Sequence, residues 1–122
     1  MGAKIEQLIL EMLSREQEGG LIKTKLDTVR ALIHYHGAIW KSELVQELTL
    51  QAAATGSEGP DMGQLDKGLH ELEKSGIVKI KKALRATLQS SSGVEDELIS
   101  IVDLHAAYTA LARDKKLALR RF

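Results

Sequence analysis

Residues 61–80 read DMGQLDKGLHELEKSGIVKI, and this stretch carries the clearest structural pattern of the chain. It predicts a helix over residues 62–74 that is followed, after a single glycine turn, by a strand. Asp61 can accept hydrogen bonds from the first-turn N–H groups, and Gln64 three residues later completes a pattern similar to a capping box. Gly76 can take the left-handed conformation that commonly ends a helix.

The helix predicted from this stretch has one apolar face and one polar face. Helical spacing brings four apolar side chains together: Met62, Leu65, Leu69 and Leu72. The opposite face carries Gly63, Lys67, His70 and Lys74, flanked by Gln64 and Glu71. A helix that packs by one face and presents short polar groups on the other is expected to contact a partner.

Length and composition limit the class of protein. The chain has 122 residues, which predicts one domain (1–122) with a single core, and only 3% of them are aromatic, so that core must be mainly aliphatic. The absence of cysteine excludes disulfides and thiol nucleophiles. No apolar run approaches the roughly 20 residues of a membrane span, and residues 1–6 show no secretory signal, so a cytoplasmic protein is expected.

The rest of the chain predicts a helical protein with one hairpin. Apolar periodicity predicts helices over residues 3–17, 23–35, 42–53 and 105–122, with Ser42 as an N-cap. A short extended piece is expected at residues 38–41. Strands are expected at residues 77–88 and 98–104, joined by a flexible turn at residues 89–93.

This order resembles the winged helix-turn-helix superfamily, in the arrangement of the MarR-type transcription regulators. The residues that carry the resemblance are Leu65, Leu69, Leu72, Gly76, Ile77 and Val78, together with Ile39-Trp40 and the helix at residues 42–53. The match covers roughly residues 23–104. It implies a mainly α fold with a small β-hairpin, flanked by the helices at residues 3–17 and 105–122.

The resemblance implies a transcription regulator that binds double-stranded DNA with the helix at residues 62–74 in the major groove. The residues expected to contact DNA are Gln64, Lys67, His70, Glu71 and Lys74 on the helix, and Lys79, Lys81, Lys82 and Arg85 on the following strand. Glutamine suits adenine, lysine suits guanine, and basic strand residues suit phosphates.

Two observations favour an alternative, a winged helix that binds a protein instead of DNA. The formal net charge is zero, and an acidic run, Glu95-Asp96-Glu97, is expected near the tip of the hairpin. RNA binding and a purely structural role are further alternatives.

A homodimer is also expected, because the first helix carries an apolar stripe that needs a partner. The stripe consists of Ile5, Leu8, Ile9, Met12 and Leu13. It has two interpretations, a helix lying on the core of its own domain or a dimerisation arm.

No pattern points to catalysis, a metal or a cofactor. The chain has no Gly-rich phosphate loop and no nucleophile or zinc-protease motif, so an enzyme is not expected. His34 and His36 are two apart, and on a helix such residues point in different directions, so they are not expected to share a metal ion. Trp40 is expected to anchor the core, or alternatively to line an effector pocket.

Overall fold

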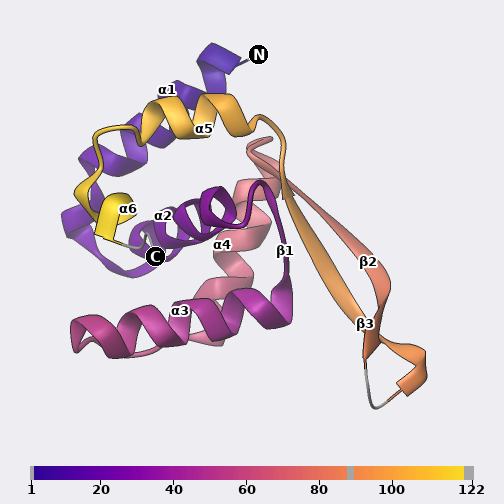
Figure 1. Ribbon diagram of the computed structural model, residues 1–122. Coiled ribbons are helices and arrows are strands. Elements are labelled where there is room, and N and C mark those ends of the chain that lie inside the picture. The colour runs from indigo at the N-terminus through magenta and orange to yellow at the C-terminus, as the bar shows by residue number, and fades with distance from the viewer. Residues whose placement is uncertain (1, 88–89, 120–122) are drawn as a thin grey trace.

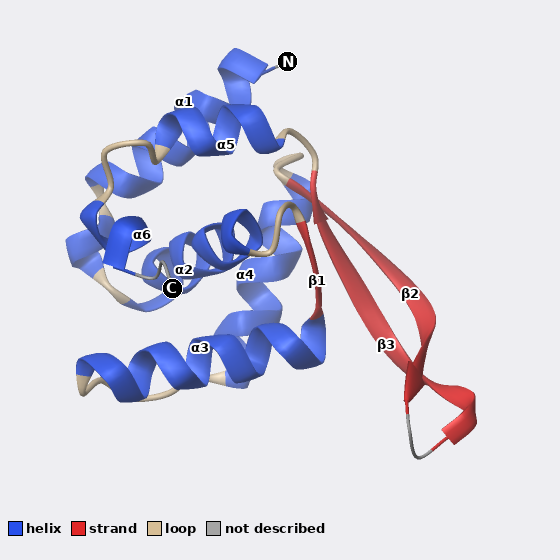
Figure 2. Cartoon of the chain, viewed as in Figure 1, coloured by secondary structure: helices blue, strands red, loops and turns tan. Residues whose placement is uncertain are grey.

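The computed structural model describes residues 2–87 and 90–119. It is mainly helical, with a small antiparallel three-stranded sheet at one side of the helices (Figures 1 and 2). The elements in chain order are α1 (Gly2–Ser14), the 3₁₀ helix η1 (Glu16–Glu18), α2 (Gly20–His34), β1 (Ala38–Trp40), α3 (Lys41–Thr55), α4 (Met62–Lys74), β2 (Val78–Thr87), β3 (Ser90–Ile101), α5 (Leu104–Ala110) and α6 (Lys115–Leu119). Helices followed by a β-hairpin confirm the predicted fold class and are compatible with a winged helix.

Helix α4 begins and ends as the sequence predicts. The Asp61 carboxylate accepts hydrogen bonds from the backbone N–H groups of Gly63 (2.8 Å) and Gln64 (3.2 Å). Gly76 adopts φ 84°, and the N–H of Ile77 donates to the carbonyl of Leu72 at 2.9 Å, which closes the last turn. The chain therefore passes from α4 into β2 through a short, hydrogen-bonded turn.

The sheet has the strand order β1-β3-β2, so the last strand lies in the middle. Ile39 of β1 pairs with Ile99 of β3, which in turn pairs with Ile80 of β2. The hairpin is longer than predicted, because β3 begins at Ser90 and not at Leu98. The proposed turn at residues 89–93 was therefore wrong for residues 90–93, and residue 89 lies outside the described residues. Pairing with β2 holds residues 94–97 of β3 in the sheet, although these residues have no apolar alternation to predict a strand.

Helix α2 lies at the centre of the fold, and α1 packs against α5. The fully buried apolar side chains include Ile9, Leu26, Leu32, Leu44, Leu65, Leu72, Ile99 and Leu111. The apolar stripe of α1 is part of this core, with Ile5, Ile9 and Met12 all buried. Of the two interpretations of the stripe, the structure therefore bears out the helix lying on its own domain.

Several predicted boundaries were wrong, each for a local reason. Helix α1 ends at Ser14, and α2 begins at Gly20, because Gly19 (φ 69°) turns the chain directly into it. Ser42 does not cap α3; it lies inside the helix, and its hydroxyl donates to Asp96 instead. The C-terminal helix is interrupted between α5 and α6. Met62 is 46% exposed and does not join the core.

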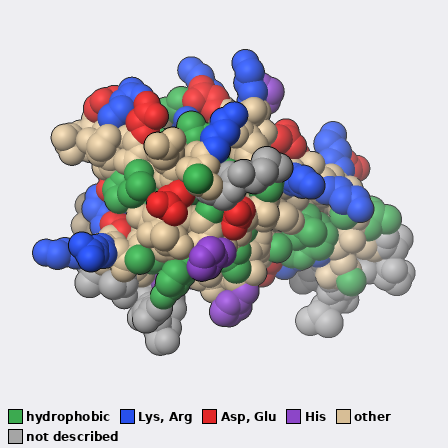
Figure 3. Space-filling model, turned by 90° about the horizontal axis from the view of Figure 1, so that it is seen from above, with side chains coloured by type: hydrophobic (Ala, Val, Ile, Leu, Met, Phe, Trp, Pro, Cys, Tyr) green, Lys and Arg blue, Asp and Glu red, His purple; other side chains and the backbone are tan. Residues whose placement is uncertain are grey.

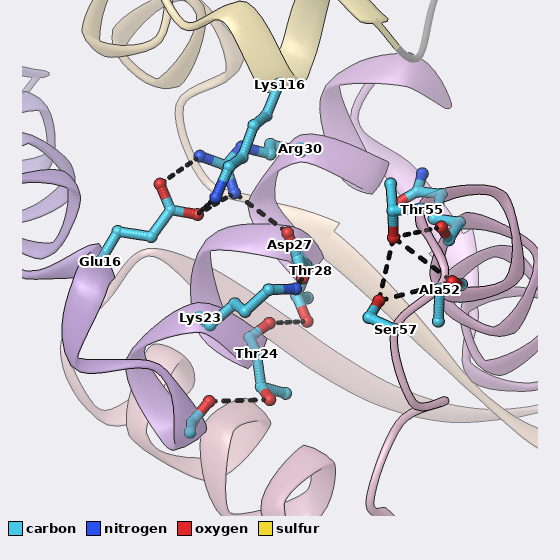
Figure 4. A network of polar contacts seen from close by, with 12 residues as sticks. Glu16, Lys23, Thr24, Asp27, Thr28, Arg30, Ala52, Thr55, Ser57 and Lys116 are labelled. Atoms are coloured by element: carbon cyan, nitrogen blue, oxygen red, sulfur yellow. Dashed lines mark hydrogen bonds and ion pairs between the residues drawn. The ribbon is translucent and has the colours of Figure 1, made fainter.

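A buried arginine ties three segments of the chain together (Figure 4). Arg30 of α2 has no exposed surface, and its guanidinium contacts the carboxylates of Glu16 (2.7 Å), Asp27 (3.0 Å) and Asp114 (2.6 Å). Burial alone lowers the pKa of Arg30, but the hydrogen bonds that it donates to Glu16 and Asp114 raise the pKa above its ordinary value. Lys116 adds a contact to Glu16 at 3.1 Å. This network joins η1, α2 and the segment before α6.

Among the described residues, no helix combines the length and the apolar character that crossing a bilayer requires.

Candidate nucleic-acid interface

The outer face of α4 is basic. With about 100° of rotation per residue, Lys67, His70 and Lys74 lie opposite the buried Leu65, Leu69 and Leu72. All three of these polar side chains are exposed. Among the described residues, neither lysine forms an ion pair within 4 Å. Two free ammonium groups and an imidazole therefore form the most outward strip of this helix.

The flank of α4 that faces α2 is closely packed. A Cβ atom added at Gly68 would lie 3.2 Å from Cγ of Lys25, so glycine lets α2 approach α4 here. Glu71, next on this flank, accepts a hydrogen bond from Lys25 Nζ at 3.0 Å. This hydrogen bond holds the pKa of the Glu71 carboxyl below its ordinary value. Gln64 lies on the same flank, with its Nε2 beside Gly20. Of the residues expected to contact DNA, Gln64 and Glu71 are thus the least outward on this helix.

Carboxylates on the other flank of α4 are held by the protein itself. Asp66 accepts a hydrogen bond from Lys41 Nζ at 2.5 Å, which raises the pKa of Lys41. The Glu73 carboxylate accepts the backbone N–H of Ile80 at 3.1 Å. Asp61 caps the start of the helix, and Glu71 binds Lys25 on the α2 side. Every acidic side chain of α4 therefore has a partner within the fold.

The basic residues of β2 do not share one face of the hairpin. Successive side chains of a strand point to opposite faces, so Lys82 lies on the same face as Ile80, while Lys79 and Lys81 lie on the other. Ile80 borders a hollow of about 400 Å³ that His70 of α4 also lines. Lys82 is therefore on the α4 side of the hairpin, whereas Lys79 and Lys81 face away from it.

Arg85 is bound within the fold. Its guanidinium donates to Ser42 Oγ at 2.9 Å and lies 3.8 Å from the carboxylate of Asp96. Burial raises the pKa of Asp96, but the hydrogen bond from Ser42 and the charge of Arg85 lower it below the ordinary value. Arg85, which the sequence predicts to contact phosphates, therefore has two partners within the fold.

The acidic run does not lie at the hairpin tip. Glu95, Asp96 and Glu97 lie within β3, where they pair in register with Leu84, Ala83 and Lys82. Glu97 also lies 3.4 Å from Lys41. This correction follows from the longer β3, which places the run in the middle of the strand.

A second hollow, of about 1000 Å³, lies between the end of α2, α3 and α5. It is lined by Ile33, His34, Tyr35, His36, Glu47, Leu104, His105, Tyr108 and Leu117. Helix α2 ends at His34, and His36 lies beyond it with φ 61°, so the helical spacing used for this pair does not describe His36. His34 Nε2 donates to the carbonyl of Leu117 at 3.0 Å. Within the described part of the chain, no three His, Asp or Glu side chains are grouped as metal ligands.

Charges of both signs are mixed over much of the surface. Figure 3 shows acidic and basic side chains interspersed on the face seen from above, in keeping with a formal net charge of zero. The basic strip of α4 is therefore a local feature.

Comparison of the chain with known protein families, with curated proteins and with solved structures found no match. The resemblance to the MarR-type regulators consequently rests on the quoted residues and on the order of the elements.

Proposed function

We propose that this chain is a winged-helix protein that binds double-stranded DNA and regulates transcription, with α4 as the recognition helix and the β2–β3 hairpin as the wing. The observation that carries the proposal is the outer face of α4. Its lysines are unpaired among the described residues, while the acidic side chains of the same helix are held by partners inside the fold. Such a face attracts phosphates and base edges of the major groove.

The chemistry of this face suits base reading. Lys67 lies in the N-terminal half of α4, the part of a recognition helix that meets base edges, and lysine can donate to guanine O6 and N7. His70 can donate to an acceptor on a neighbouring base. Lys74 at the end of the helix and Lys82 on the α4 side of the hairpin suit phosphates.

The test is the binding of a mixed pool of labelled duplex fragments, measured by fluorescence anisotropy at about 50 and about 200 mM salt. We expect salt-sensitive binding that weakens at least tenfold in a Lys67→Gln/Lys74→Gln double variant. The matched control is Lys4→Gln/Lys115→Gln, which removes the same charge from exposed positions on α1 and α6. Equal losses in both double variants, or no binding by the parent protein, would exclude α4 as the recognition helix.

A protein-binding winged helix is the second candidate. It is favoured by the neutral net charge and by Leu84 on the hairpin, an apolar side chain that is 69% exposed. Affinity capture from the source cells, with and without nuclease, separates the two. A stoichiometric protein partner that survives nuclease and is lost in Leu84→Asp would favour this candidate over DNA binding.

We also propose a homodimer, formed through the end of the molecule that contains α1 and α5. The buried stripe of α1 no longer supports it, but other apolar side chains on these helices are exposed. They are Leu10 (43%), Leu104 (37%) and Tyr108 (46%).

A further inference from the structure

The sheet has an outer face that points away from the helices. Ile39 and Ile99 lie on the inner face, with 1% and 0% of their surfaces exposed. Figure 2 shows the helices gathered on one side of the hairpin. Side chains alternate along each strand, so the neighbours of these two residues must belong to the outer face.

Two rows of side chains cross this outer face. In the first row, Trp40 of β1 pairs with Leu98 of β3, and Leu98 pairs with Lys81 of β2. The second row joins Ala38, Ser100 and Lys79 in the same way. Strands are about 4.8 Å apart, so Lys81 and Trp40 are separated by about 10 Å between their backbones. The side chain of Lys81 is long enough to span about half of the distance to Trp40.

The first row combines an aromatic ring with a positive charge. Trp40 is the single tryptophan of the chain, and it is partly exposed. Lys79 and Lys81 are both exposed, and neither forms an ion pair within 4 Å among the described residues. The carboxylate of Asp96 on this face is already held by Ser42 and Arg85. The charge beside Trp40 is therefore positive.

We propose that the outer face of the sheet, defined by Trp40, Leu98, Lys79 and Lys81, is a binding site for single-stranded DNA. An unpaired base stacks on Trp40, and the adjoining phosphates bind the two lysines. Aromatic stacking combined with a basic strip is the usual chemistry of sites that bind single strands without reading their sequence. The site is separate from the outer face of α4 and does not depend on the function proposed for that helix.

Two features of the row select this ligand. A duplex keeps its bases stacked within the helix, so only an unpaired strand can offer a base to Trp40. The sugar between base and phosphate comes to lie over Leu98, in the middle of the row. A 2′-hydroxyl placed against that apolar side chain loses its hydrogen bonds to water, so the deoxyribose of DNA is favoured over ribose.

The competing explanation for the lysines is protection of the sheet edge. β2 is an edge strand, and lysines on such strands oppose pairing with the edge of another molecule. That explanation predicts no nucleic-acid binding and gives Trp40 no part.

The experiment uses the full chain and a 12-nucleotide oligodeoxythymidine. Since Trp40 is the only tryptophan, its fluorescence reports directly on the site. We expect the oligonucleotide to quench this fluorescence, with an affinity that falls as salt is raised. Lys79→Gln/Lys81→Gln should weaken binding at least tenfold, while Lys67→Gln/Lys74→Gln, which disables α4, should leave it within about twofold. Absence of quenching, or equal effects of the two double variants, would overturn the proposal.

Variants of Trp40 test the stacking contact, with a labelled oligonucleotide as the probe. Trp40→Phe keeps an aromatic ring and should retain most of the affinity, whereas Trp40→Leu keeps only the apolar bulk and should lose at least about fivefold. Circular dichroism checks that each variant is folded. If Trp40→Leu does not fold, the proposal is tested by the lysine variants and by the quenching of Trp40 fluorescence. A 12-nucleotide oligouridine that binds more tightly than the DNA strand would overturn the choice of DNA.

Discussion

Arg30 and Asp114 are 84 positions apart in the chain, and their side chains meet at 2.6 Å in the interior. The Asp114 carboxylate also accepts the backbone N–H of Leu117 at 3.1 Å, so it caps α6 while it neutralises the arginine. One carboxylate thus connects the central helix to the start of the last one.

Replacing Arg30 with methionine should strongly destabilise the protein. The apolar stem is retained, but Glu16, Asp27 and Asp114 lose the cation that compensates their burial, and breaking such a buried pair costs about 3–5 kcal/mol. Urea unfolding followed by circular dichroism measures the loss. Lys116→Met is the control, because Lys116 touches the same network from a side chain that is 53% exposed, and it should cost less than about 1 kcal/mol. A loss at Arg30 no larger than that of the control would show that the network adds little stability.

Stability should fall in acid through Glu16. Burial alone raises the pKa of its carboxyl, but hydrogen bonds from Arg30 and Lys116 hold the pKa at about 2. Because this value is below that of the unfolded chain, the stabilisation is present above about pH 4.5 and is lost as the pH falls from there toward 2. Urea midpoints measured between pH 7 and 2 should therefore decline more steeply for the parent protein than for Glu16→Gln. Parallel declines would contradict the assignment.

The cap of α4 should contribute measurably to folding. Asp61→Ala removes the acceptor of two backbone N–H groups and should lower the free energy of unfolding by about 1 kcal/mol. Glu58→Ala changes the same charge at an exposed position in the preceding loop, and it should be nearly neutral. Chemical denaturation of the two variants side by side makes the comparison, and equal values would place the effect of Asp61 in its charge and not in the cap.

Lys41 should support DNA binding without touching DNA. Its ammonium group neutralises Asp66 at 2.5 Å and lies 3.4 Å from Glu97, beside the outer face of α4. In Lys41→Met both carboxylates become uncompensated, and we expect duplex binding to weaken about two- to fivefold, which corresponds to less than about 1 kcal/mol. Lys115→Met, with the same change of charge on α6, should leave binding unaltered. This prediction depends on the proposed role of α4, and unchanged binding in Lys41→Met would contradict it.

The proposed homodimer gives a prediction about mass. Light scattering at tens of micromolar should report twice the mass of the chain, and Leu104→Glu should reduce it to the monomer. Leu50→Glu is the control, since Leu50 of α3 is 67% exposed and lies on another element. A monomeric parent protein, or an equal effect of both substitutions, would remove α5 from the interface.

Sequence reasoning succeeded where the determining interactions are local. The cap at Asp61, the turn at Gly76 and the apolar spacing between them fix α4 with residues that are neighbours in the chain. It failed for the first part of β3, before Leu98, where pairing with β2 holds polar residues in a strand without any apolar pattern. It also missed Arg30, because the carboxylates that make its burial possible come from separate segments.

The arrangement of the candidate site was predicted where it depends on local spacing, and missed where it depends on contacts between separate segments. Helical spacing identified Lys67, His70 and Lys74 as the outer face of α4, as the structure confirms. The division of the strand lysines between two faces could have been read from the alternation of a strand, since Lys81 and Lys82 are consecutive. The partners of Arg85 could not have been predicted from the sequence, because Ser42 and Asp96 come close to Arg85 only through the long hairpin.

The buried arginine also sets the smallest autonomous unit of this protein. A fragment of residues 23–104 contains every element of the winged-helix resemblance, yet it lacks Glu16 and Asp114. Arg30 would then be left in the interior with Asp27 as its remaining carboxylate from this network. The flanking segments therefore supply two of the three carboxylates that compensate Arg30, and we expect α2 and α4 not to fold as an independent module without them.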